Sequence, residues 1–281
     1  MVSKTEEMDE RINRIAASAN LSAYDSEGTR KYIDGAPHIK HASLRRLYGK
    51  MLVQVYDFAR QHTENPTVLD LGAGEGSVTL GFLELGARIT AVDISRSQLD
   101  VLQDRCKQFA DRLEVRCEDI NNALLDTDPK YSIIVANSFL HHIPDYIGLM
   151  RQAVGALSDH GQFCTFQDPL RYDSMGRINM LFSNLAFFSW RIFKGDVLGG
   201  IKRRLRRSRG IYLSDSIHDN AEYHVSRNGV DQNAICCFLK EQGFDCDIVP
   251  YFSTNSRVFQ PIGTALGVKN TFAVIARRKR P

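Results

Sequence analysis

The chain has 281 residues, 43% of them apolar and 25% charged, with a formal net charge of +3. It is long enough for one large globular domain or two small ones, and its mild charge argues against an obligatory polyanionic partner. The N-terminus is charged, without the apolar core of a signal peptide, and no uncharged apolar run reaches the ~18 residues of a membrane span. A cytoplasmic protein is expected.

The six cysteines favour the same compartment. None forms a C-x-x-C pair, and none lies at zinc-finger spacing from a histidine. We therefore expect reduced thiols and no metal site.

The N-terminal region is predicted to be helical. Apolar residues recur at helical spacing over 4–20, a polar, turn-rich stretch follows over 21–37, and a longer helix is expected over 38–60. The buried stripe of that longer helix would contain Leu44, Leu47, Leu52, Val55 and Phe58. Because this region contains no strand, we expect residues 1–62 to form a helical cap on the rest of the chain.

From residue 67 the sequence alternates between strands and helices. The five expected strands are 68–71, 88–93, 113–117, 131–136 and 162–167. Such alternation predicts a mostly parallel sheet with helices on both faces and a functional site at the carboxyl ends of the strands. The pattern breaks at Asp168 and resumes with a helix over 230–242. Two apolar runs, 244–249 and 271–277, then fit an antiparallel edge.

A glycine-rich turn follows the first strand. Asp70 ends that strand, and Gly72, Gly74 and Gly76 come next, where the backbone must turn tightly and a ligand can approach closely. The dinucleotide fingerprint G-x-G-x-x-G would place its third glycine at the position of Ser77. The spacing therefore argues against a nicotinamide oxidoreductase.

The segment from Asp70 to Gly76 resembles the first motif of class I S-adenosylmethionine-dependent methyltransferases, D/E-x-G-x-G-x-G. The resemblance implies an α/β, Rossmann-like, seven-stranded, mostly parallel sheet with a reversed edge strand. It also implies a methyltransferase domain over 63–281, with a helical lid inserted after the fifth strand at about 169–229.

The resemblance also assigns cofactor contacts. Asp93, at the end of the second strand, would bind the ribose hydroxyls, and Asp119, at the end of the third, would accept from the adenine amino group. Ile94 and Ile120 would enclose the adenine, and Asn137 would face the methyl-donor end. The full expected S-adenosylmethionine set is Asp70, Gly72, Ala73, Gly74, Gly76, Asp93, Ile94, Asp119, Ile120 and Asn137. For Asp93 and Asp119 the structural alternative is a helix cap.

The segment from Phe139 to Asp145 is similar to the L-H-H-I-x-D segment of small-molecule methyltransferases, including the ubiquinone and menaquinone group. It lacks the prolines and the Pro-Cys pair of nucleic-acid base methyltransferases, so no nucleic-acid partner is expected. Histidine titrates near neutral pH and suits a base for a hydroxyl acceptor. His142 is the first candidate, followed by His141 and then His218 and His224. The alternative is that these histidines cap a helix or bond the backbone.

Two further features lie in the insertion. The stretch 177–193 reads as a helix that is apolar nearly all round, and six of the eight residues 202–209 are cationic. The helix fits a packed or dimeric interface, a lid over an apolar acceptor, or an interfacial helix. Together the two features suggest peripheral membrane contact through 178–209, while a solvated charge run is the alternative.

The sequence thus predicts a methyltransferase that acts on a small or lipid-linked acceptor, apolar or anionic, as a monomer or homodimer. O-methylation of a hydroxyl is favoured because histidines are expected near the methyl group. C-methylation of a quinone-like or polyketide-like ring, and a cofactor-binding protein without turnover, are the alternatives.

Overall fold

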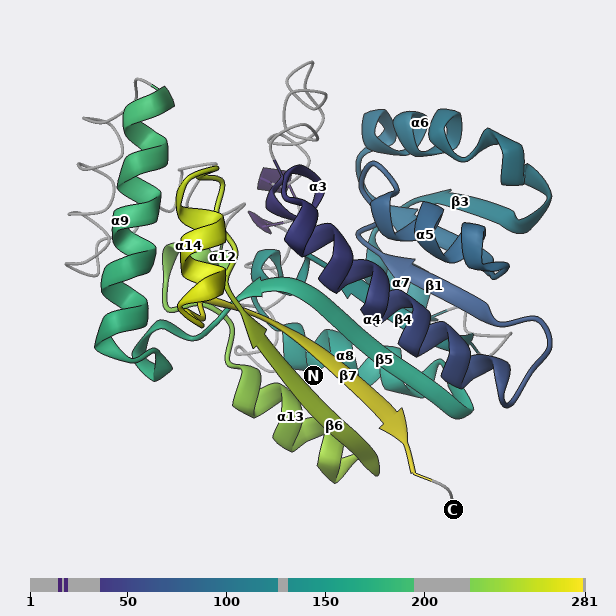
Figure 1. The fold of residues 1–281 in the computed structure, drawn as a ribbon. Helices are drawn as coiled ribbons and strands as arrows, with labels where there is room; N and C mark the ends of the chain where they lie inside the picture. The colour runs from purple at the N-terminus through teal and green to yellow at the C-terminus, as the bar shows by residue number, and fades with distance from the viewer. Residues whose placement is uncertain (1–14, 17, 20–35, 126–130, 195–222, 280–281) are drawn as a thin grey trace.

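The computed structural model describes residues 15–16, 18–19, 36–125, 131–194 and 223–279 (Figure 1). The helix expected over 4–20 lies largely outside these ranges. So do the cationic run 202–209 and His218.

Seven strands form one sheet in the order β3-β2-β1-β4-β5-β7-β6. They are β1 (Thr67–Leu71), β2 (Arg88–Asp93), β3 (Leu113–Cys117), β4 (Tyr131–Asn137), β5 (Leu157–Pro169), β6 (Phe244–Tyr251) and β7 (Thr271–Arg278). β1 to β5 pair in parallel, whereas β7 runs antiparallel to both of its neighbours, β5 and β6. The predicted seven-stranded sheet with one reversed strand is confirmed, and the reversed strand lies beside the edge strand β6.

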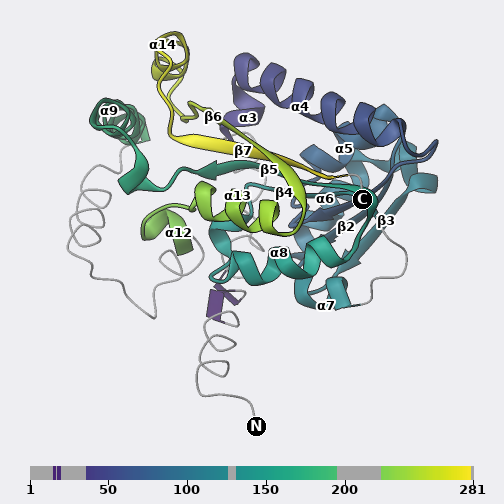
Figure 2. The same cartoon turned by 90° about the horizontal axis from the view of Figure 1, so that it is seen from below.

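Helices cover both faces of the sheet (Figure 2). One face carries α4 (Ala42–Arg60), α5 (Ser77–Leu85) and α6 (Arg96–Arg105), and the other carries α7 (Ile120–Leu125), α8 (Tyr146–Gly155) and α13 (Gln232–Glu241). Alternate strand residues divide between two cores: Val68 and Ile133 pack on the α4 side, and Leu69 and Ile134 on the α8 side. Because β1 and β4 are buried on both faces, they read as continuous apolar runs in the sequence.

The N-terminal helical region contributes directly to the core. The single helix expected over 38–60 is divided into α3 (Pro37–Lys40) and α4 by an extended residue, His41. Leu44, Leu52 and Val55 are buried as predicted, and Leu47 and Phe58 are half-buried. The Gln162 side chain donates a 2.8 Å hydrogen bond to the Val55 carbonyl, which joins α4 to β5. The boundary expected at residue 62 stays a prediction.

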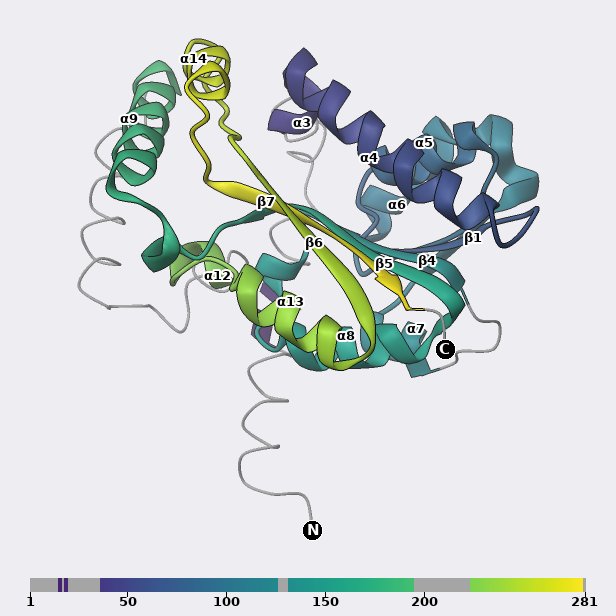
Figure 3. The same cartoon turned by 60° about the horizontal axis from the view of Figure 1, so that its bottom comes forward.

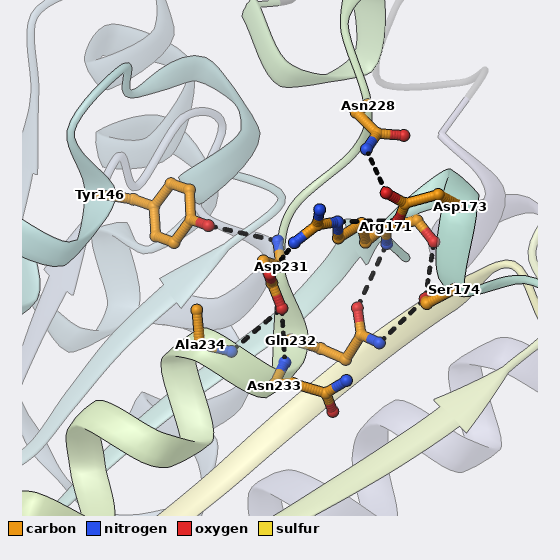
Figure 4. Close-up of polar contacts among 9 residues, drawn as sticks. All are labelled: Tyr146, Arg171, Asp173, Ser174, Asn228, Asp231, Gln232, Asn233 and Ala234. Carbon is orange, nitrogen blue, oxygen red and sulfur yellow. Dashed lines mark hydrogen bonds and ion pairs between the residues drawn. The ribbon is translucent and has the colours of Figure 1, made fainter.

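A polar network joins the two ends of the long insertion (Figure 4). Arg171, just after β5, pairs with Asp231 at the N-cap of α13 and, at 2.7 Å, with Asp173. Asn228 donates to the same Asp173 at 3.0 Å, and the Asp231 amide donates to the Tyr146 hydroxyl at 3.2 Å. These contacts hold the two ends of the insertion, near Arg171 and Asp231, next to each other.

Beyond the carboxyl end of β5, two helices stand apart from the layers (Figures 1 and 3). α9 (Arg177–Lys194) is the expected apolar helix, and α14 (Phe259–Ala265) lies in what the sequence suggested was a loop between the last two strands. Within the described ranges, no helix combines the length and hydropathy required to cross a bilayer.

Candidate active site

The glycine turn after β1 has the conformation that its sequence predicts. Gly72, Gly74 and Gly76 all have left-handed backbones, with φ of 68°, 53° and 84°. A Cβ on Gly72 would lie 2.1 Å from the Phe139 ring, and one on Gly76 would lie 2.6 Å from Leu102. These two glycines therefore let β1 and α5 pack closely against their neighbours, which is a structural requirement in addition to any ligand.

Gly74 is different, because a Cβ built on it would meet nothing within 4 Å. Its amide donates to Asp93 Oδ2 at 2.9 Å, and the Ser95 amide donates to Asp93 Oδ1 at 2.8 Å. Both oxygens of Asp93 are thus oriented by backbone at the open side of the turn. Burial raises the pKa of Asp93, so its charge is best compensated by further hydrogen-bond donors. A sugar with two hydroxyls supplies such donors.

Asp70 and Asn137 present buried oxygen atoms at the ends of β1 and β4. Asp70 is fully buried and accepts from the Thr79 hydroxyl at 2.6 Å through Oδ2. In the described part of the chain, neither Asp70 Oδ1 nor Asn137 Oδ1 has a hydrogen-bond partner. Burial raises the pKa of Asp70 to about 7. Buried acceptors without donors are costly, and an ammonium group would satisfy them, so the residues fit the expected cofactor.

Asp119 follows β3 and takes part in the start of α7. Its Oδ1 accepts from the Asn121 amide at 2.9 Å and from the Asn121 side chain at 2.8 Å. That is the capping arrangement named above as the alternative to adenine binding. Ile120 is buried and Ile94 is half-buried. The adenine contacts of these residues stay predictions.

A buried chain of three polar side chains connects β4 and β5. The Thr165 hydroxyl donates to Asp168 Oδ2, while Asp168 Oδ1 lies 2.8 Å from His141 Nδ1 and accepts from the His141 amide at 3.1 Å. Thr165 and Asp168 are fully buried, and His141 is 5% exposed. A carboxylate that accepts from Nδ1–H fixes the tautomer with its lone pair on Nε2, which is the orientation required of a general base.

The backbone next to this chain is strained. Ser138 and Gln167 are non-glycine residues with φ of 53° and 66°, and Ser138 donates its amide to the Phe166 carbonyl. The β5–β7 pairing shifts register between Thr165 and Asp168. The Gln167 amide donates to the Tyr251 hydroxyl at 3.0 Å, which holds this bulge. Strain of this kind persists where neighbouring contacts enforce it, and it occurs often at functional sites.

The other histidine candidates have different surroundings. His142 is buried beside His141, with ring centroids 4.0 Å apart. His224 Nε2 lies 2.9 Å from the Ile143 carbonyl, which can only accept, so that nitrogen carries a proton. Burial lowers the pKa of His224. Its contacts attach α12 (Tyr223–Ser226) to the histidine segment, and the catalytic roles of His142 and His224 stay predictions.

A second group of buried polar atoms comes from α3 and α4. No sequence motif marks its two residues, His38 and Tyr48. The Tyr48 ring packs edge-on against Phe166 at 5.4 Å and lies 5.7 Å from the ring of His38. In the described structure, Tyr48 Oη and His38 Nδ1 are buried without a hydrogen-bond partner. Burial raises the pKa of Tyr48, with a further contribution from Asp70, and lowers that of His38 to about 4.

The sequence contains one usable signal for this second group. His38 lies in the N-terminal helical region, where no motif marks site residues. Tyr48 stands one turn after Leu44 and one turn before Leu52, so a phenol interrupts an otherwise apolar stripe. Thr165 and Asp168 gave no comparable signal, because they lie within and just after an apolar strand.

Comparisons with known proteins agree with this geometry. A family model described as "Methyltransferase domain" matches residues 69–163. The demethylmenaquinone methyltransferase of Tropheryma whipplei is 28% identical over 167 residues, 52% of this chain and 68% of that protein. The ubiquinone biosynthesis O-methyltransferase of Coxiella burnetii is 28% identical over 95 residues, 34% of this chain and 40% of that protein. The plantazolicin methyltransferase BpumL, solved with SAH, superposes with a TM-score of 0.54 at 14% identity, covering 99% of this chain and all of its own.

Proposed function

Since this chain is a class I S-adenosylmethionine-dependent methyltransferase of the small-molecule type, we propose that it methylates a hydroxyl of a largely apolar small molecule, with His141 as the base. The observation that carries the proposal is the buried Thr165–Asp168–His141 chain at the carboxyl ends of β4 and β5. The sequence alone favoured His142. We place His141 first because it has the carboxylate partner.

The cofactor, when bound, supplies an electrophilic methyl group on a sulfonium. On the protein side, Asp93 accepts from the ribose hydroxyls and Asp70 accepts from the ammonium. Gly74 leaves the space above the turn open. Asn137, at the end of β4, would face the methyl-donor end of the cofactor, and alignment of the acceptor there would supply most of the rate enhancement.

His141 Nε2 would take the proton of the acceptor hydroxyl, and the hydroxyl oxygen would then accept the methyl group that the cofactor supplies, with the cofactor leaving as a neutral thioether. Asp168 stabilises the imidazolium that results, and Thr165 fixes the orientation of Asp168. Tyr48, which packs against Phe166, and the neighbouring His38 would orient the acceptor through their buried Oη and Nδ1 atoms. Because the pKa of His38 is about 4, its imidazole is neutral at pH 7 and can accept a hydrogen bond.

A quinone-like aromatic ring is the acceptor class that we favour. Two relatives are named for demethylmenaquinone and for ubiquinone biosynthesis, and one of these names specifies O-methylation. C-methylation of such a ring is the second candidate, because the name of the demethylmenaquinone enzyme does not specify the atom that is methylated. Peripheral membrane contact through 178–209 also stays a prediction.

The test combines acceptor screening with matched histidine variants. Hydroxylated quinols and their O-blocked analogues are incubated with S-adenosylmethionine, and methylated products are identified by mass and fragmentation. His141→Asn should lower turnover about 10²- to 10⁴-fold and leave S-adenosylhomocysteine affinity unchanged. His160→Asn is the control, because His160 stacks on His62 at 4.3 Å, away from the carboxyl ends of the strands.

Three outcomes separate the alternatives. Loss of turnover in His142→Asn with normal turnover in His141→Asn would move the base to His142. A product methylated on the ring carbon, also formed from O-blocked analogues, would establish the C-methylation alternative. Tight S-adenosylhomocysteine binding with no methylated product from either acceptor class would favour a binding protein without turnover.

A further inference from the structure

The helices α9 and α14 form an antiparallel pair outside the two layers of the domain. Phe182 of α9 packs edge-on against Phe252 and Phe259, at 5.5 Å and 5.4 Å between ring centroids. Asn179, near the start of α9, accepts from the amide of Lys269, which follows α14. Near the other end, Ser189 lies 3.5 Å from Ser256, which precedes α14. The start of one helix therefore meets the end of the other.

Both helices expose a regular row of aliphatic side chains. Nine large apolar residues are exposed among those that the structure describes, and seven of them belong to this pair. On α9 the row has exposed fractions from 50% to 81%, and on α14 and its N-cap from 45% to 67%. The seven residues, here called the aliphatic face, are Ile178, Leu181, Leu185, Ile192, Val258, Ile262 and Leu266. Spacings of three, four or seven residues put each row on one side of its helix.

The two rows lie on the same side of the pair. On α9, Leu181 and Leu185 each come one residue before Phe182 and Ala186, which face α14. On α14, Val258 and Ile262 likewise come one residue before Phe259 and Gly263, and a Cβ on Gly263 would lie 2.9 Å from Phe182. In two antiparallel helices, the same rotation from the contact row leads to the same side, so the rows form one continuous surface.

The charges around this surface have one sign. Residues 175–194 and 248–270 contain no Asp or Glu. Arg177 and Arg257 are exposed immediately before the first residue of each row, and Lys269 is exposed after α14. The sequence continues into the cationic run 202–209. Within the two described segments that form it, the aliphatic surface is accompanied by cations and by no carboxylate, which makes it complementary to anionic headgroups above acyl chains.

We infer that the aliphatic face of α9 and α14 docks on the surface of an anionic lipid bilayer. The observations favour a membrane over a second copy of the chain, because an isologous dimer through this face would bring Arg177, Arg257 and Lys269 towards their own copies. The helices would lie in the interface plane, since none of the described helices can span a bilayer. The inference extends the predicted contact from 178–209 to α14, and it holds whichever atom of the acceptor is methylated.

The direct test is vesicle flotation of the full chain. Wild-type protein should float with phosphatidylcholine–phosphatidylglycerol vesicles at 0.1 M salt and remain at the bottom with phosphatidylcholine alone. Leu181→Gln/Leu185→Gln and Ile262→Gln/Leu266→Gln should each lower the partition coefficient at least tenfold, because each removes two aliphatic side chains from the membrane. Val53→Gln is the matched control, since Val53 is a 42% exposed aliphatic residue on α4.

The cationic contribution is measured separately. Arg177→Gln/Arg257→Gln should weaken binding several-fold at 0.1 M salt, and the difference from wild type should shrink at 0.5 M salt. Failure of the wild type to float would overturn the inference. So would normal flotation of both Leu/Ile double variants, which would assign any membrane contact to 202–209 alone. A dimer in light scattering that the double variants convert to a monomer, without vesicle binding, would assign the face to self-association.

The result can be distinguished from a failure of the proposed function. A thermal shift with S-adenosylhomocysteine requires no membrane, and neither does methyl transfer to a short-chain, water-soluble quinol. Both should be unchanged in the Leu181→Gln/Leu185→Gln variant.

Discussion

The two halves of the sheet carry the site in different ways. On the β1–β3 side, the expected cofactor contacts come from the turn and strand ends that follow one another along the chain from Asp70 to Asp119. On the β4–β7 side, residues far apart in sequence meet: His141 with Asp168, Tyr48 with Phe166, and Tyr251 with Gln167. The first half is a local motif that any class I chain can keep, whereas the second is assembled by tertiary contacts and is where acceptor specificity would arise.

The two halves of the sheet also differ in their insertions. The loop before α14 is tied to the N-terminal helices, since Lys40 Nζ donates to the Asn255 carbonyl at 2.8 Å and His41 Nε2 lies 2.9 Å from the Thr254 carbonyl. The N-terminal helices and the loop before α14 thus meet, although the bonded residues lie 215 and 213 positions apart in the chain. Between β1 and β3, where every residue is described, no insertion of this kind occurs.

Gly72 follows β1 and lies against Phe139, which follows β4, and its substitution should have the largest effect on stability. Gly72→Ala should lower the free energy of unfolding by about 3 kcal/mol, because it combines an unfavourable φ with a clash against Phe139. Chemical denaturation measures this loss. Gly74→Ala is the control: with open space around it, it should cost only about 1 kcal/mol and instead weaken S-adenosylhomocysteine binding. Equal losses of stability in both variants would contradict the assigned difference.

Asp93 tests the β1–β3 half alone. Asp93→Ala should weaken S-adenosylhomocysteine binding about 100-fold, because a carboxylate that accepts two hydroxyl hydrogen bonds is removed. Calorimetry measures the affinity. Asp100→Ala serves as the control, since its carboxylate is 59% exposed and pairs with Arg96 on the same helix. Unchanged affinity in Asp93→Ala would remove the ribose assignment.

Asp70 predicts a pH dependence of cofactor affinity. Its pKa of about 7 in the ligand-free protein lies above the unfolded value of 3.8, so the folded state holds the extra proton between about pH 4 and pH 7. Its contribution therefore lowers the free energy of unfolding as pH rises through that window. An ammonium ligand requires the ionised form, so S-adenosylhomocysteine affinity should rise about tenfold from pH 6 to pH 8.

The matched variant for this prediction is Asp70→Asn. It should flatten the pH dependence and weaken S-adenosylhomocysteine binding. Because it removes a buried charge, it should also raise the free energy of unfolding of the ligand-free protein at pH 8 by about 1–3 kcal/mol. A pH profile as steep as that of the wild type would assign the titration to another group.

Tyr48 gives the smallest expected effect and tests the β4–β7 half. Tyr48→Phe should stabilise the ligand-free protein by about 1 kcal/mol, because it removes a buried hydroxyl without a partner, and should leave S-adenosylhomocysteine affinity unchanged. Turnover of the acceptor should fall several-fold. Tyr56→Phe, two turns further along α4 and in the core, is the control. A rise in stability without any change in the acceptor KM or kcat would make Tyr48 a packing residue only.

Much of the fold could be read from local sequence. The apolar run of β1 and the three glycines after it act locally, so the strand and the turn appear where the pattern placed them. In the structure, the Ser95 cap of α6 and the left-handed Gly86 that ends α5 are local signals of the same kind. The end of β5 and the short helix α14 could not be read in this way. β5 extends to Pro169 because β7 pairs with it, and α14 is held by Phe182 from α9 rather than by a long amphipathic pattern of its own.

The same division holds for the site. The sequence by itself indicated the methyl donor through its resemblance to the D/E-x-G-x-G-x-G motif, whose carboxylate and glycines lie within seven residues of the chain. Only the tertiary structure decided which histidine meets a carboxylate, since His141 and Asp168 come together through the parallel pairing of β4 and β5. It alone also decided that α9 and α14 share one aliphatic face. Strand register and helix packing depend on residues that are far apart in the sequence, so a local pattern does not encode the contacts that they create.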